Sequence, residues 1–189
     1  ALSTIKVLFP PEDEQKVIAE VLSDIDDLIT AQEELIAKKR DIKQATMQQL
    51  LTGRTRLPRF KSKWTMKKVK DIAVCFSGGT PSTRNNAYYN GNIPWITSGD
   101  LNIRYIEQVK ASITELGLRN SSTKIVKSGT VVIAMYGATA GIAAISQISA
   151  AINQAVLAIE LADCSPQYIH ALLEFKKDWI IDTYTQGGQ

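Results

Sequence analysis

The sequence predicts an α+β protein, in which a long N-terminal helix of coiled-coil type precedes a β-rich α/β domain. Residues 12–52 contain no glycine or proline and repeat apolar side chains every seven residues. From residue 64 onward, short apolar runs alternate with turns rich in Gly, Ser and Asn. The charge divides in the same way, because residues 1–52 hold six basic and ten acidic side chains (6 − 10 = −4) and residues 53–189 hold sixteen and nine (16 − 9 = +7).

We therefore divide the chain into four segments, which are a strand at 1–11, a helix at 12–53, a basic linker at 54–63 and the β-rich domain at 64–189. Ser3–Phe9 has the alternation of a short strand, and Pro10-Pro11 ends it. Three acids, Glu12–Glu14, favour the positive end of a helix dipole. Gly53 is the expected cap at the other end.

The helix carries an apolar stripe along its length. One column of the stripe is Val21, Leu28, Leu35 and Ile42. A helix of roughly 40 residues would be ~60 Å long, and such a stripe is typical of a helix that packs on a second helix. This chain has no second helix of similar length, so we expect a partner in another chain or in a further part of the protein. The alternative is an ordinary core helix that lies along its own domain.

The β-rich domain is predicted from its apolar runs and from the turns between them. One amphipathic helix follows at about Ser165–Asp182, with Ser165 as its N-cap and Pro166 in its first turn. The predicted strands are Ile72–Phe76, Pro94–Thr97, Tyr105–Gln108, Lys124–Val126, Thr130–Tyr136, Ile142–Ile145 and Ala151–Ile159.

Several function classes find no support in the sequence. No apolar run is long enough for a transmembrane helix, and residues 1–11 lack the features of a signal peptide. Cys75 and Cys164 are expected to be free buried thiols, which suits a reducing cytoplasm. The single histidine, His170, is expected to be structural. Phe76–Thr80 lacks the ending of a phosphate-binding loop, so a structural turn is the better interpretation.

No cluster with the spacing of a zinc site or of a two-metal nuclease occurs either. Catalysis by this chain is therefore not expected.

Two features are suited to binding. Eight basic residues and no acid lie between Arg54 and Lys70, where they can follow phosphates or simply form a solvated linker. The stretch Ser77–Arg104 is dense in Ser, Thr, Asn, Tyr and Arg, and Tyr136–Gly141 forms a second loop of this kind. Arg can bond guanine and Asn adenine through two hydrogen bonds. On these grounds alone, the loops could equally bind a polysaccharide or a protein.

The chain resembles the HsdS specificity (S) subunits of Type I restriction-modification systems over nearly its whole length. Leu8–Gln15 is similar to a proline-rich junction of that family, and Leu50–Gly53 to the end of its spacer helix. The remaining matching segments are Ile18–Glu20, Ile25-Asp26, Trp64 with Lys68–Ile72, Ser77–Ser82, Tyr89, Gly91, Ile93–Ile96, Ser98–Leu101, Gly129–Gly141 and Asn153–Ala155.

The resemblance implies a specific architecture. Such subunits carry two target recognition domains separated by two long antiparallel helices, and each domain reads one half of a split DNA site. The helices also dock methyltransferase (M) subunits, which bind S-adenosylmethionine, and restriction (R) subunits add ATP- and Mg-dependent cleavage. No cofactor is expected in this chain itself, and no membrane partner.

The chain departs from that pattern because it has one spacer helix and one domain, and it stops at Gln186–Gln189 before the segment that would close the domain. We expect Ser3–Phe9 to act as the closing strand, in cis or exchanged from another chain. We also expect self-association through the helix stripe, with a homodimer mate or the second helix of a full-length subunit as the partner.

The resemblance and the residue types together give a set of candidate contacts. Phosphate contacts are expected from Arg56, Lys61 and Lys63. Contacts with the rest of the DNA are expected from Thr80, Ser82, Arg84, Asn85, Asn86, Tyr88, Ser98, Asn102, Arg104, Tyr136 and Thr139. One alternative is a coiled-coil adaptor whose β-rich domain binds protein, and another is a recognition domain of a fused methyltransferase-nuclease.

Overall fold

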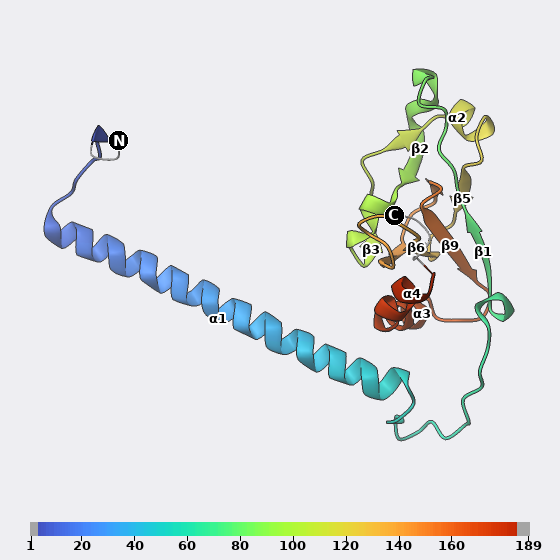
Figure 1. Cartoon of the computed structure of the whole chain (residues 1–189), viewed down its shortest axis with the longest axis horizontal. Helices are drawn as coiled ribbons and strands as arrows, with labels where there is room; N and C mark the ends of the chain where they lie inside the picture. Colours follow the sequence, from blue (N-terminus) through green and yellow to red (C-terminus); the bar gives the residue numbers. More distant parts are fainter. Residues whose placement is uncertain (1–3, 185–189) are drawn as a thin grey trace. The chain divides into compact units, whose positions relative to one another are not determined.

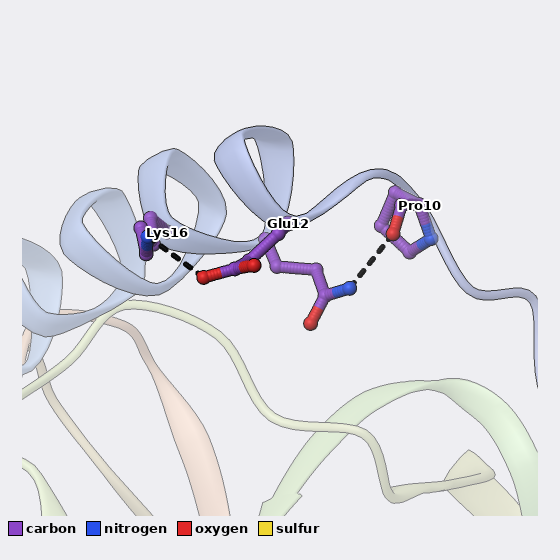
Figure 2. A network of polar contacts seen from close by, with 4 residues as sticks. Pro10, Glu12 and Lys16 are labelled. Carbon is purple, nitrogen blue, oxygen red and sulfur yellow. Dashed lines mark hydrogen bonds and ion pairs between the residues drawn. The ribbon is translucent and has the colours of Figure 1, made fainter.

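The computed structural model of the chain describes residues 4–184, and it divides the chain into two compact units, residues 1–49 and 50–189. The first unit consists largely of α1, Glu12–Leu51, which has 40 residues and confirms the long helix (Figure 1). Its start is fixed by backbone and side-chain bonds, because Gln15 N donates to Pro11 O at 3.0 Å and Gln15 Nε2 donates to Pro10 O at 2.7 Å. Figure 2 shows this turn, with the ion pair of Lys16 Nζ and Glu12 Oε1 at 2.9 Å.

Gly53 ends the helix as predicted. Its φ of +72° lies in the left-handed region that glycine adopts without strain, and its N–H donates to Leu50 O at 3.3 Å. A Cβ at this position would lie 3.2 Å from the ring of Trp64. The indole therefore packs directly on the glycine, which places the following linker against the last turn of the helix.

No residue of α1 is buried, and the helix forms a unit of its own by compactness. The alternative of an ordinary core helix stays an alternative. Leu28 is 60% exposed and Leu35 47% exposed, although both are large apolar side chains. The other exposed apolar residues of the stripe are Ile18, Val21, Leu22, Ile25, Ile29, Ile36 and Ile42. The stripe is thus uncovered within the first unit.

The strand predicted at Ser3–Phe9 is not formed. Ser3 lies outside the described residues, Thr4 lies in a 3-10 turn, and Ile5–Phe9 have no regular secondary structure. A strand requires a paired neighbour, and this segment has none among the described residues. The closing role of the segment stays a prediction.

The second unit contains two sheets. The five-stranded sheet has the order β1-β9-β6-β7-β3, and the four-stranded sheet has the order β4-β2-β8-β5. The first sheet consists of β1 Ala73–Ser77, β9 Val156–Leu161, β6 Val131–Ala134, β7 Ala143–Ser146 and β3 Tyr105–Ile106. The second consists of β4 Ser112–Ile113, β2 Tyr89–Ile96, β8 Ala150–Ile152 and β5 Lys124–Val126.

The helices of this unit are short. They are η2 Val69–Asp71, η3 Asn86–Tyr88, η4 Ser98–Asn102, α2 Glu115–Arg119, α3 Pro166–Phe175 and α4 Lys177–Tyr184. The strand Ala151–Ile159 that the sequence predicted is two strands, because Asn153–Ala155 form a turn between β8 and β9. The predicted helix Ser165–Asp182 is interrupted at Lys176, which separates α3 from α4. Its predicted cap is confirmed, since Tyr168 N donates to Ser165 Oγ at 3.3 Å.

Strand β2 is bent rather than straight. Tyr89 and Ile93 both pair with Ile113 of β4, so the strand carries extra residues between them. Asn90 adopts a φ of +57° there. The dipeptide Asn90-Gly91, which is typical of a turn between strands, therefore forms a bulge inside one strand.

Two apolar clusters give the unit three layers. The first cluster lies between the two sheets, with Ile96 and Ile152 from one sheet and Val132 and Ala158 from the other fully buried. The second joins the five-stranded sheet to α3 and α4 through Val131, Ile169 and Ile180. The apolar run of β6 is buried throughout because this strand has core on both faces.

Candidate nucleic-acid interface

Three loops of the second unit meet at the turn between β8 and β9, residues 153–155. Asn153 N donates to Ile96 O at 3.1 Å, which joins the turn to the end of β2. Met135 N donates to Ala155 O at 2.9 Å, which joins it to the end of β6. Gly79 N donates to Ile152 O at 3.1 Å, which brings in the end of β1. We call residues 78–82, 97–102, 135–141 and 153–155 the loop edge.

The glycines of the loop edge permit a very close backbone approach. A Cβ on Gly78 would lie 1.9 Å from Ile152 O, and one on Gly79 would lie 2.1 Å from Ser122 Oγ. Thr123 Oγ1 donates to Gly79 O at 2.8 Å. These contacts explain the Ser-Gly-Gly sequence as a structural turn, as expected.

The loop edge presents polar side chains to solvent. Thr80 is exposed and donates its hydroxyl to Gln154 Oε1. Tyr136 is 46% exposed, while Ser98 and Thr139 are half-buried. Of the residues proposed from the sequence, Thr80, Ser82, Ser98, Asn102, Tyr136 and Thr139 belong to this edge.

Gln154 was missed as a site residue. Its side chain is exposed at the centre of the three loops, and its amide is oriented by Thr80. The signal for it is an Asn-Gln pair between two apolar runs, where a turn is expected and a large polar side chain has no structural need. Prediction of one continuous strand from 151 to 159 concealed that turn.

A second group of predicted contacts lies on another part of the unit. Arg84, Asn85, Asn86 and Tyr88 belong to a segment that packs against Thr114 and α2, since Thr114 Oγ1 donates to Ala87 O at 2.8 Å and Thr114 N to Tyr88 O at 2.9 Å. Figure 1 shows this segment beside α2 and apart from β3. Asn85 Oδ1 accepts from Ala87 N at 3.1 Å and caps η3, so one of its acceptor positions has a structural use.

Arg104 follows η4 on an exposed edge. Its guanidinium lies 5.4 Å from the ring centre of Tyr105, and its carbonyl accepts from Ile145 N at 2.8 Å. Asn102 Nδ2 donates to Gly99 O at 3.0 Å. The turn that precedes Arg104 is held by Asp100 Oδ2, which accepts from Thr97 N at 2.8 Å and from Thr97 Oγ1 at 2.7 Å.

The basic linker shows two kinds of side chain. Lys61 and Lys63 are exposed. Arg56 is half-buried, lies 5.0 Å from the ring centre of Trp64, and donates from Nη2 to Ser62 O at 3.0 Å. Its charge therefore also stabilises the local conformation of the linker.

The residues of types that could serve in catalysis, which are the histidine and the cysteines, are placed by the packing of the domain and not grouped in a site. His170 is buried in α3, and its Nε2 donates to Ala143 O at 3.0 Å. Among residues 4–184, no group of three or more His, Cys, Asp or Glu side chains could hold a metal ion. The expectation of two buried thiols is wrong, because Cys75 is exposed on edge strand β1 and Cys164 is half-buried. Partial burial raises the pKa of the Cys75 thiol.

Within the described part of the chain, no helix combines the length and the apolar character needed to cross a membrane.

Comparison with known sequences gives one family. Residues 61–189 match the Type I restriction modification DNA specificity domain. The specificity subunit of the Type I restriction enzyme MjaIX from Methanocaldococcus jannaschii is 40% identical over 73 residues, which are 37% of this chain and 17% of the relative. The EcoR124I/EcoR124II specificity subunit from Escherichia coli is 32% identical over 68 residues, which are 35% and 17%.

Solved structures share the fold. The HsdS subunit from Thermoanaerobacter tengcongensis superposes with a TM-score of 0.59 at 14% identity, covering 91% of this chain and 43% of that one. The S subunit from M. genitalium superposes with a TM-score of 0.60 at 15% identity, covering 94% and 45%. The chain thus spans less than half the length of these subunits. Because the family match extends over more than half of its residues, the chain belongs to the Type I restriction-modification DNA specificity domain family.

Proposed function

We propose that this chain recognises one half of a split DNA target and performs no catalysis of its own. The observation that supports this function is the loop edge, where exposed polar side chains from three loops gather around one turn of a protein in the specificity-domain family. Base recognition needs such side chains held on a rigid scaffold, so that hydrogen-bond donors and acceptors meet base edges in fixed positions.

The proposal assigns two kinds of contact. Exposed Lys61 and Lys63 contact phosphates, which supplies affinity that depends on salt but not on sequence. Arg104 and Gln154 are the strongest candidates for base contacts, because both are exposed and their side chains are suited to paired hydrogen bonds with guanine and adenine.

Replacement of Arg104 by alanine is expected to relax specificity. Loss of a paired contact with a guanine costs about 1–3 kcal/mol of discrimination at one base pair, with little effect at the others. Fluorescence anisotropy with duplexes that differ at single positions measures this. Asn120→Ala is the matched control, because Asn120 is also exposed and polar but lies at the end of α2. An unchanged ranking of all duplexes in the Arg104→Ala variant would refute the assignment.

Replacement of Lys61 by alanine is expected to weaken binding to every duplex by a similar factor. One phosphate contact fewer lowers the slope of log affinity against log salt by about 1. Titrations at a series of salt concentrations measure the slope. Lys110→Ala removes the same charge from another exposed position and should leave the slope unchanged. A sequence-dependent loss in Lys61→Ala would contradict a phosphate contact.

The proposal extends to partners. The exposed stripe of α1 holds a second helix, either from a second copy or from another part of a longer subunit. Methyltransferase subunits dock on the paired helices and bind S-adenosylmethionine, and restriction subunits supply ATP- and Mg-dependent cleavage, all in the cytoplasm. Methylome sequencing of cells that carry this chain with its methyltransferase partner tests the function directly. We expect methylated adenines in one split motif. In a separate binding experiment, a chain that binds a protein but does not bind duplex DNA would favour the adaptor alternative.

A further inference from the structure

An apolar pocket lies where the helix ends. It belongs to the second unit, has a volume of 340 Å³, and is lined by the last turn of α1, by the linker and by one residue of α3. The lining residues are Leu50, Leu51, Thr55, Arg56, Leu57, Phe60, Trp64 and Tyr168. Leu57, Phe60 and Trp64 are each about half exposed, so the pocket is open to solvent. An open apolar pocket of this size is a surface on which apolar side chains of a partner could be buried.

An exposed apolar segment lies directly before the same helix begins. Leu8 is fully exposed and Phe9 is 80% exposed, and Ile5 and Val7 are exposed as well. These four side chains occur within five residues and have no apolar cover among the described residues. Burial of a side chain of this kind is worth about 1.5–3 kcal/mol, so the segment has a strong tendency to bind an apolar surface.

The helix between these two features has an apolar column that is symmetric about its middle, as antiparallel self-pairing requires. Its column of Val21, Leu28, Leu35 and Ile42 is centred on the helix, because Val21 lies nine residues after Glu12 (21 − 12 = 9) and Ile42 nine residues before Leu51 (51 − 42 = 9). A two-fold axis near the middle therefore covers the column on both copies. It also brings the start of each helix beside the end of the other.

The charges of the two halves of α1 also favour an antiparallel pair. Residues 12–27 hold seven acids and one base (1 − 7 = −6), and residues 36–51 hold four bases and one acid (4 − 1 = +3). A parallel pair would place acid against acid and base against base. An antiparallel pair places each acidic half against a basic half, which is favourable on electrostatic grounds.

We propose that Ile5–Phe9 of one copy docks in the apolar pocket at the end of α1 in a second copy. This inference rests on the self-pairing of α1 that the proposed function includes. Paired helices lie about 8–10 Å apart, and the three steps from Glu12 back to Phe9 reach about 10 Å at ~3.3 Å per residue. Leu8 and Phe9 therefore reach the pocket beside Leu51 of the partner copy. The arrangement is closed, because each copy gives one segment and one pocket.

Disulfide trapping between two separately prepared variants tests the docking. Both variants carry Cys75→Ser and Cys164→Ser, so that no native thiol interferes. One variant adds Phe9→Cys and the other adds Leu57→Cys. We expect the oxidised mixture to give a covalent two-chain product, because the two thiols meet in the pocket. Each variant alone should give little product, because the two-fold axis places equivalent residues near opposite ends of a helix pair ~60 Å long.

The matched control replaces Leu57→Cys by Ile103→Cys, which places a thiol at another exposed apolar residue of the same unit. Equal trapping with Ile103→Cys would overturn the docking. A chain that carries both Phe9→Cys and Leu57→Cys and closes on itself as a monomer would overturn the exchange between copies. Absence of trapping while sizing still gives the mass of two chains would overturn the docking and leave the helix pairing intact.

A single-chain mass for the unmodified protein would overturn both the self-association and the docking. The DNA-binding proposal would be unaffected, because the titrations with duplex DNA test it separately. As a second measurement, Phe60→Asp should weaken self-association about 30-fold, as expected for an aromatic side chain at the centre of a contact. Ile103→Asp should leave self-association unchanged.

Discussion

Replacement of Leu28 and Leu35 by glutamate is expected to convert a two-chain particle into single chains. Both leucines lie in the Val21–Ile42 column of the stripe and are exposed in the single chain, so the proposed helix pairing would bury them. A two-fold pair loses four leucines (2 × 2), each worth about 1.5–3 kcal/mol of burial, so the total is roughly 6–12 kcal/mol. The new carboxylates add repulsion to the loss of apolar contact. Sedimentation equilibrium over a range of concentrations measures the change.

The same replacement should leave the second unit folded. Neither leucine contributes to its core, which is built from strand residues between the two sheets and below α3. We therefore expect an unchanged melting transition of that unit and a loss of helical signal from α1, because isolated helices are marginal in water without packing.

The matched control places the same charges on the opposite face of the helix. Thr30→Glu and Ala37→Glu have the same spacing of seven residues and lie outside the apolar columns. This variant should keep the two-chain mass. Equal dissociation in both variants would show that charge alone disrupts the assembly, and an intact pair after replacement of Leu28 and Leu35 would exclude the stripe as the interface.

The sequence was informative where local rules decide the structure. The bounds of α1 follow from an uninterrupted seven-residue repeat between Pro11 and Gly53, and Gly53 adopts the positive φ that a C-cap favours. Strand β5 occurs at Lys124–Val126 as predicted, since turn residues bound it on both sides. Periodicity and turn chemistry act within a few residues, so they can be read without knowledge of the rest of the fold.

Features that depend on distant partners could not be predicted. Ser3–Phe9 has a strand pattern, but its residues Ile5–Phe9 form no strand with any described part of the chain. Strand β4 has only two residues, which pair with β2 where β2 bulges at Asn90. The interruption at Asn153–Ala155 exists because three other loops donate and accept hydrogen bonds there. These bonds connect residues that are 20 to 73 positions apart, so no local pattern reports them (155 − 135 = 20; 152 − 79 = 73).

The candidate site was predicted in composition but not in arrangement. The polar stretch Ser77–Arg104 was expected to supply DNA contacts from loops, and the structure distributes it over the loop edge, the segment beside α2 and the edge near β3. Residues 84–88 are drawn toward α2 by Thr114, which lies 26 residues after Tyr88 and carries no signal of that contact (114 − 88 = 26). Gln154 became visible only when the turn it occupies was known.

Replacement of Gly78 by alanine is expected to lower the stability of the second unit more than the addition of one methyl group at any other glycine of that unit. The added Cβ would lie 1.9 Å from Ile152 O and 2.6 Å from Ile152 C, and both are backbone atoms that cannot rotate away. Relief requires β1 and β8 to separate, which breaks the bond from Gly79 N to Ile152 O. We expect a loss of about 3 kcal/mol or more, and a fall of the melting temperature by roughly 10 °C. Differential scanning calorimetry measures both.

Two further glycines separate close approach from backbone conformation as the cause. Gly137 has a φ of +81° and no atom within 4 Å of its would-be Cβ, so Gly137→Ala should cost only the left-handed backbone, about 1–2 kcal/mol. Gly99 has no positive φ, and the nearest atom to its would-be Cβ is Thr97 Oγ1 at 3.8 Å, so Gly99→Ala should be nearly neutral. A Gly78→Ala variant no less stable than Gly99→Ala would mean that the β1 and β8 ends are free to move apart. The loop edge would then not be the rigid scaffold that base recognition requires, because Thr80 and Gln154 are held together by that same approach.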